Sequence, residues 1–130
     1  MKKIHFWLGL LGILVFLATG GYMHIYHGHL REMADRPRLL YRSAHIYTLL
    51  VSVINLSLGV YFRPSTAKLG RYCQYLASSI LLLSPILLVC GFFLEPPAGN
   101  LGRPFVRTGI YGLFGVGVLL VLQSLFERKK

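Results

Sequence analysis

Residues 72–94 read YCQYLASSILLLSPILLVCGFFL, and this stretch contains no Asp, Glu, Lys or Arg. A helix of about 20 apolar residues is long enough to cross the hydrocarbon core of a bilayer, which is about 30 Å thick. Three further uncharged runs of similar length lie at 4–26, 43–62 and 109–126. The chain therefore carries four candidate transmembrane helices, and these runs lack the period-two alternation of a membrane β-barrel.

The composition agrees with a membrane protein. Of the 130 residues, 55% are hydrophobic and 14% are charged, and the mean hydropathy is +0.59. The net charge of +10 would also suit a nucleic-acid-binding protein, but the basic residues gather at the ends of the apolar runs, where they anchor helices against lipid headgroups. We expect the partners to be the lipid bilayer and other membrane protein subunits, with no nucleic acid.

The fold predicted from these runs is an all-α bundle of four antiparallel transmembrane helices. The helices are expected at about 4–27, 36–62, 66–94 and 104–127, within a single domain that covers residues 1–130. Neighbouring helices should be antiparallel because the connections between them are short.

Local signals set the predicted boundaries of these helices. Asp35 is expected to cap the second helix and Ser65 to cap the third, since short polar side chains can accept the first free N–H groups of a helix. Pro96 and Pro97 are expected to end the third helix just after residue 94.

The distribution of basic residues predicts the orientation. The N-terminus imitates a signal peptide, but its apolar run continues to Tyr26, so we expect an uncleaved signal-anchor helix. With the N-terminus inside, eight basic residues lie inside and six outside, which favours cytoplasmic termini. We expect an integral protein of a bacterial inner membrane, with the histidine-rich segment 20–30 facing outward.

Each run also has one face of small or polar residues at helical spacing, and such residues favour helix contacts in lipid. In the second helix this face is Tyr41, His45, Thr48, Ser52, Asn55 and Gly59. In the first it is Gly9, Gly12, Phe16, Gly20, Met23 and His27; in the third Gln74, Ser78, Pro85, Phe92 and Glu95; in the fourth Thr108, Gly112, Gly115 and Leu119.

The candidate site lies at the predicted outer end, where His24, His27, Arg42, His45 and Glu95 are expected to converge. Glu95 is expected near the C-terminus of a helix, where the helix dipole disfavours negative charge. It should therefore pair with a cation, and the candidates are Arg42, Arg103, Arg107 or a protonated histidine.

Three functions fit this cluster. In the first, His24 or His27 pairs with His45 to ligate haem, or His24, His27, His45 and Glu95 hold a transition metal, because imidazole suits copper, zinc and haem iron.

In the second, Arg42, Arg103 and Arg107 contact an anionic headgroup or a quinone. An enzyme acting on such a substrate would use a histidine as the general base, with Glu95 orienting it.

In the third, which we favour, the cluster is an interfacial belt of a non-enzymatic subunit or accessory or assembly factor of a membrane complex. His5, next to Trp7, is expected to be an interfacial anchor at the other end. The sequence contains no Walker motif, serine nucleophile elbow or H-E-x-x-H motif.

Overall fold

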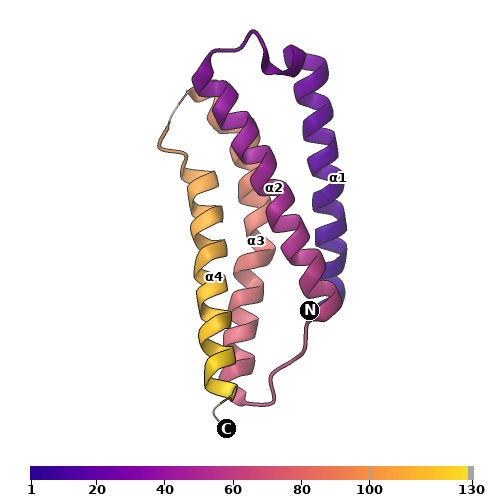
Figure 1. The fold of residues 1–130 in the computed structure, drawn as a ribbon, viewed down its shortest axis with the longest axis vertical. Helices are drawn as coiled ribbons and strands as arrows, with labels where there is room; N and C mark the ends of the chain where they lie inside the picture. Colours follow the sequence, from indigo (N-terminus) through magenta and orange to yellow (C-terminus); the bar gives the residue numbers. More distant parts are fainter. Residues whose placement is uncertain (100, 129–130) are drawn as a thin grey trace.

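The structure is a computed structural model that describes residues 1–99 and 101–128, with residues 122 and 124–128 described by their backbone alone. Its elements in chain order are α1 (Lys2–His27), the short 3-10 helix η1 (Gly28–Leu30), α2 (Asp35–Tyr61), α3 (Lys68–Ala98) and α4 (Pro104–Arg128). The four α-helices lie side by side along the long axis of the molecule (Figure 1). Within the described residues, all four are long and apolar enough to cross a membrane, which confirms the predicted bundle.

The two ends of the bundle differ in what they carry. The start of α1 and the end of α4 lie at one end, which we name the terminal end, together with the α2–α3 connection (Figure 1). The opposite end, which we name the histidine end, carries η1, the connection to α2 and the turn between α3 and α4. The chain thus crosses the bundle four times in alternating directions, as the short connections predict.

The helices pack mainly in chain order, α1 on α2, α2 on α3 and α3 on α4, with α4 making little contact with α2. Large apolar side chains cover the outside of the bundle, including Trp7 at 64% and Phe114 at 67% exposed. A large apolar exterior is unfavourable in water but suits contact with lipid tails. The four long apolar helices and this apolar exterior identify the chain as an integral membrane protein.

The polar face predicted for the second helix points into the bundle. Tyr41, Thr48, Ser52, Asn55 and Gly59 are all buried, and His45 is half-buried. The faces predicted for the first and third helices are also turned inward: their residues are buried or half-buried.

The face predicted for the fourth helix is wrong at Thr108 and Gly115, whereas Gly112 and Leu119 are half-buried. Thr108 and Gly115 are exposed, and α4 instead buries Val106, Gly109, Leu113 and Val116. Glycines lie on more than one face of this helix, so their spacing does not identify the contact face. The face that packs against α3 is the apolar one.

Three predicted helix boundaries are also corrected. Asp35 is the first residue of α2 rather than its cap, and its carboxylate pairs with Arg38. The Ser65 hydroxyl accepts the N–H of Ala67, which is itself the N-cap of α3, so Ser65 shapes the connection before the helix. The third helix continues through Pro96 and Pro97, because proline has a helical φ and removes only two N–H donors in the last turn.

The α1–α2 contact brings two helix backbones together through glycine. A Cβ placed on Gly9 would lie 2.4 Å from the backbone nitrogen of Leu56, and one on Gly59 would lie 2.5 Å from the Cα of Phe6. Small residues at such positions allow close van der Waals packing, which drives helix association in lipid. The register between α1 and α2 therefore depends on these glycines.

Replacing Gly9 with alanine should lower the free energy of unfolding by about 1–3 kcal/mol, because the new methyl group overlaps the α2 backbone. The matched control is Gly21→Ala in the same helix, where a Cβ meets no described atom within 4 Å and helix propensity improves. Equilibrium unfolding in mixed detergent micelles measures the free energy of unfolding of both variants. Equal stability of the two variants would contradict the close approach.

Candidate functional site

Glu95 is buried, with 4% of its surface exposed. Its Oε1 accepts the backbone N–H groups of Phe105, at 2.8 Å, and Val106, at 3.0 Å. These donors lie in the first turn of α4, where N–H groups have no carbonyl partner within their own helix. The carboxylate from α3 therefore caps α4, and its charge faces the positive end of that helix's dipole.

The cation that pairs with Glu95 is Arg103, one of the four partners predicted. Its Nε donates to Oε2 of Glu95 at 3.4 Å, and its Nη2 lies 3.5 Å from the carbonyl oxygen of Leu40 on α2. Arg103 also has a left-handed backbone, with φ 48°, which is uncommon for a residue with a side chain. The turn before α4 is thus held to both α3 and α2.

The other two predicted arginines lie apart from this pair. Arg42 and Arg107 are exposed, and among the described residues neither forms an ion pair. Their predicted contact with an anion or a partner remains a prediction.

His24 lies at the exposed surface and pairs with a residue that was not predicted. Its Nδ1 is within hydrogen-bonding distance of Nε2 of His29, and the ring centroids are 4.0 Å apart. His29 follows in η1, where its left-handed φ of 58° belongs to the sharp turn after α1. The two imidazoles form a pair at the corner of the bundle.

His27 belongs to a separate aromatic cluster, which consists of Tyr22, His27, Tyr41 and Phe92. The His27 ring lies 5.3 Å from Tyr22 and 5.2 Å from Tyr41, between centroids. The Phe92 ring is fully buried and packs against both tyrosines. This cluster joins α1, α2 and α3, and it includes Tyr41 and Phe92 from the predicted inward faces of the second and third helices.

His45 is bound to α1 by one side chain. Its Nδ1 lies 2.9 Å from Oγ1 of Thr19, and that hydroxyl donates its hydrogen to the carbonyl oxygen of Phe16. Because a hydroxyl has one hydrogen, Nδ1 of His45 must be the donor of this bond, which leaves Nε2 with a lone pair. The ring also stacks on Phe16 at a centroid distance of 4.0 Å.

At the terminal end, His5 is not the interfacial anchor expected from its sequence neighbour Trp7. It is fully buried, and its Nδ1 lies 2.7 Å from Oδ1 of Asn55. The Asn55 amide nitrogen donates to the carbonyl oxygens of Val51 and Leu81, so the pair links α1, α2 and α3. The predicted face of the first helix, extended back by one turn from Gly9, contains His5 and was the signal for its burial.

The predicted convergence of the site residues does not form. His24, His27, His45 and Glu95 each have different neighbours, and the described residues include no group of three or more His, Cys, Asp or Glu side chains able to hold a metal ion. The cause is helical rotation: His24 and His27 are three residues apart, yet one is exposed and the other is half-buried against aromatic rings. A four-ligand metal site is therefore not supported by the geometry, while haem ligation by two histidines stays a prediction.

Comparisons of the chain with protein-family models, with curated proteins and with solved structures found no match.

Replacing Glu95 with alanine should destabilise the bundle by about 2 kcal/mol, because two backbone donors and Arg103 lose a charged partner in a buried site. Glu95→Gln keeps one carbonyl acceptor and should lose less. Unfolding in mixed micelles measures the stability, and amide hydrogen exchange at Phe105 and Val106 tests the cap directly. Asp35→Asn is the control, because Asp35 is exposed; slow exchange at both amides in Glu95→Ala would contradict the cap.

Proposed function

We propose that the chain is a non-enzymatic subunit or accessory protein of a membrane complex, and that it receives a transmembrane helix of its partner. The observation that carries this proposal is the incomplete packing of α4. A groove of about 570 Å³ lies between α2 and α4, and its walls are apolar. They include Leu50 and Ile54 from α2 and Phe114, Gly117 and Val118 from α4.

A helix is the occupant that this groove favours. A Cβ placed on Gly117, which lines the groove, would meet no described atom within 4 Å, so the backbone of α4 is open on this side. In lipid, small residues are typical of positions where another helix backbone approaches closely. An additional helix along α4 would cover the groove and Gly117 together.

The polar side chains inside the bundle support the non-enzymatic part of the proposal. Glu95 caps α4, Asn55 holds His5, and Thr19 holds His45. These bonds join one helix to another. In an enzyme, Glu95 would have to orient a catalytic histidine. That histidine would compete for the carboxylate with the two N–H groups and the arginine that Glu95 already binds.

Site-specific photo-cross-linking in intact membranes tests the proposed partner. A photoreactive phenylalanine at position 114, in the groove, should yield one discrete protein adduct, and Gly117→Leu in the same groove should reduce that yield at least about tenfold. The control position is 111 on the same helix: Tyr111 and Phe114 are 68% and 67% exposed, but Tyr111 does not line the groove. Lipid adducts alone at position 114, or equal protein adducts at both positions, would contradict the proposal.

The alternative is a haem- or transition-metal-binding protein, and one observation favours it. The hydrogen bond that His45 Nδ1 donates to Thr19 favours the neutral tautomer whose Nε2 keeps a lone pair for a metal, as the hydrogen-bond partner of a metal-ligating imidazole does.

Elemental analysis of protein purified without a histidine tag tests the alternative. Near-stoichiometric iron, copper or zinc is expected in that case, and His45→Ala should remove it while the protein stays folded. Thr19→Val should weaken metal binding, since loss of the hydrogen-bond partner of a ligating histidine typically costs about 10–100-fold in metal affinity. Full retention of metal in His45→Ala would rule out His45 as the ligand.

A further inference from the structure

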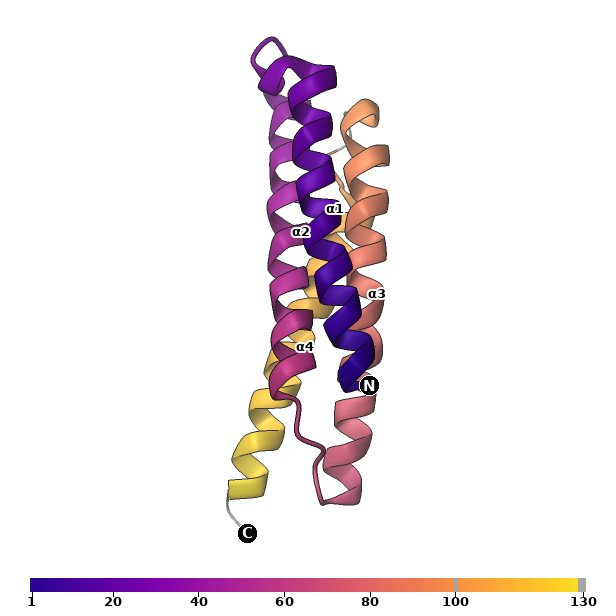
Figure 2. The same ribbon diagram turned by 90° about the vertical axis from the view of Figure 1, so that its right-hand side faces the viewer.

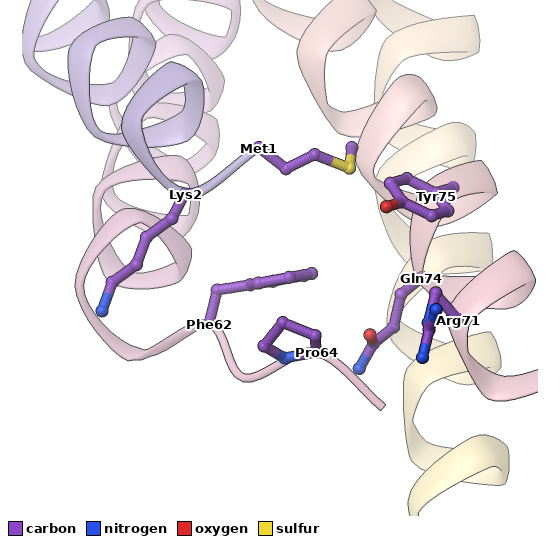
Figure 3. Close-up of a pocket in the computed structure, with 7 residues that line it drawn as sticks. All are labelled: Met1, Lys2, Phe62, Pro64, Arg71, Gln74 and Tyr75. Carbon is purple, nitrogen blue, oxygen red and sulfur yellow. The ribbon is translucent and has the colours of Figure 1, made fainter. Parts of the chain in front are cut away.

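A pocket of about 270 Å³ lies at the terminal end, between the start of α1, the α2–α3 connection and the first turns of α3. Figure 3 shows Lys2 and Arg71 on opposite sides of this pocket, with the rings of Phe62 and Pro64 between them and Tyr75 above. The pocket thus combines two cationic side chains with an apolar floor. That combination suits an amphiphile with an anionic head.

The cations at this pocket are available to a ligand. Among the described residues, neither Lys2 nor Arg71 forms an ion pair, and both are exposed. Gln74 is already occupied: its Oε1 accepts the N–H of Ser65, and its Nε2 donates to the carbonyl oxygen of Arg63. Gln74 is therefore a structural part of the pocket wall, whereas Lys2 and Arg71 supply the positive charge of the pocket.

The surrounding sequence leaves this positive charge uncompensated. Residues 1–3 and 61–75 contain Lys2, Lys3, Arg63, Lys68 and Arg71 but no Asp or Glu. At the histidine end, by contrast, Glu32, Asp35 and Glu95 accompany the arginines. Basic residues close to a membrane surface attract anionic lipids.

A second, apolar pocket lies farther along the seam between α1 and α3. It has a volume of about 240 Å³ and is lined by Leu8, Leu11 and Val15 from α1 and by Pro85, Ile86 and Val89 from α3, among others. Leu8 and Val15 lie seven residues apart on α1, and Met1, the N-cap of α1, precedes Leu8 by the same interval. Tyr75, Leu82 and Val89 repeat every seven residues on α3, so each set shares one helix face. The two pockets therefore follow one another on the same seam.

The spacing of the two pockets matches one leaflet of a bilayer. At about 1.5 Å per residue, the apolar pocket begins about 9 Å from Lys2 along α1 and ends about 20 Å from it. Half of a hydrocarbon core of about 30 Å is about 15 Å. A lipid with its phosphate at the first pocket would thus place an acyl chain in the second.

From these two pockets we infer that the seam between α1 and α3 binds one anionic phospholipid. Lys2 and Arg71 would bind the phosphate, Phe62 and Tyr75 would pack on the glycerol region, and an acyl chain would lie against Leu11 and Val89. The net negative charge of the headgroup distinguishes this lipid from a zwitterionic one, because the pocket walls supply two cations and no carboxylate.

Native mass spectrometry of the full chain, released from mild detergent, tests this inference with phosphatidylglycerol and phosphatidylcholine of identical chains. The protein should retain phosphatidylglycerol at least about tenfold better. The double variant Lys2→Gln, Arg71→Gln should lose this preference. The charge-matched control is Arg31→Gln, Arg36→Gln at the histidine end, where both arginines are exposed, and it should retain the preference.

Two further arms separate a lipid from a soluble phosphate. Val89→Phe, which fills the apolar pocket without changing charge, should weaken phosphatidylglycerol binding several-fold, whereas Leu83→Phe on an exposed face of α3 should not. Inorganic phosphate should not displace the lipid. Equal retention of both lipids, equal losses in both double variants, or displacement by phosphate with no effect of Val89→Phe would each overturn the inference.

Discussion

Polar groups inside a lipid-embedded bundle have no water to bond with, and most of this structure follows from that constraint. Glu95 meets it by capping α4, and its second oxygen takes the guanidinium of Arg103. Asn55 meets it by accepting from His5 and donating to two backbone carbonyls. Each of these side chains joins different helices, so satisfying the polar groups also fixes how the helices are arranged.

The two halves of the bundle are held by different forces. The α1–α2 pair depends on backbone contact through Gly9 and Gly59, reinforced by the bond between Thr19 and His45. The α3–α4 pair is anchored at its turn by Glu95, and along its length Val106, Leu113 and Val116 are the buried apolar residues of α4. Because α4 makes little contact with α2, a groove is left between them. Figure 2 shows α4 on the side of the bundle away from α1. The proposed subunit function rests on this groove.

The histidine end and the terminal end also differ chemically. At the histidine end, Glu95 pairs with Arg103, and His27 packs against Tyr22 and Tyr41. At the terminal end, Lys2 and Arg71 border a pocket with no acidic residue in its walls. One end is thus stabilised internally, and the other is complementary to an external anion. The proposed partner helix and the proposed lipid would occupy different seams.

The sequence by itself determined the membrane-spanning class, the number of helices and the inward face of α2, because uncharged length and helical spacing are local properties of the chain. It also indicated that Glu95 needs a cation, since a carboxylate at a membrane boundary is costly without a partner. It did not determine that Glu95 caps α4, that His5 is buried against Asn55, or that His24 and His27 separate. Those outcomes depend on the rotation of each helix about its axis and on its register against its neighbours, and only the packing of all four helices decides these two quantities.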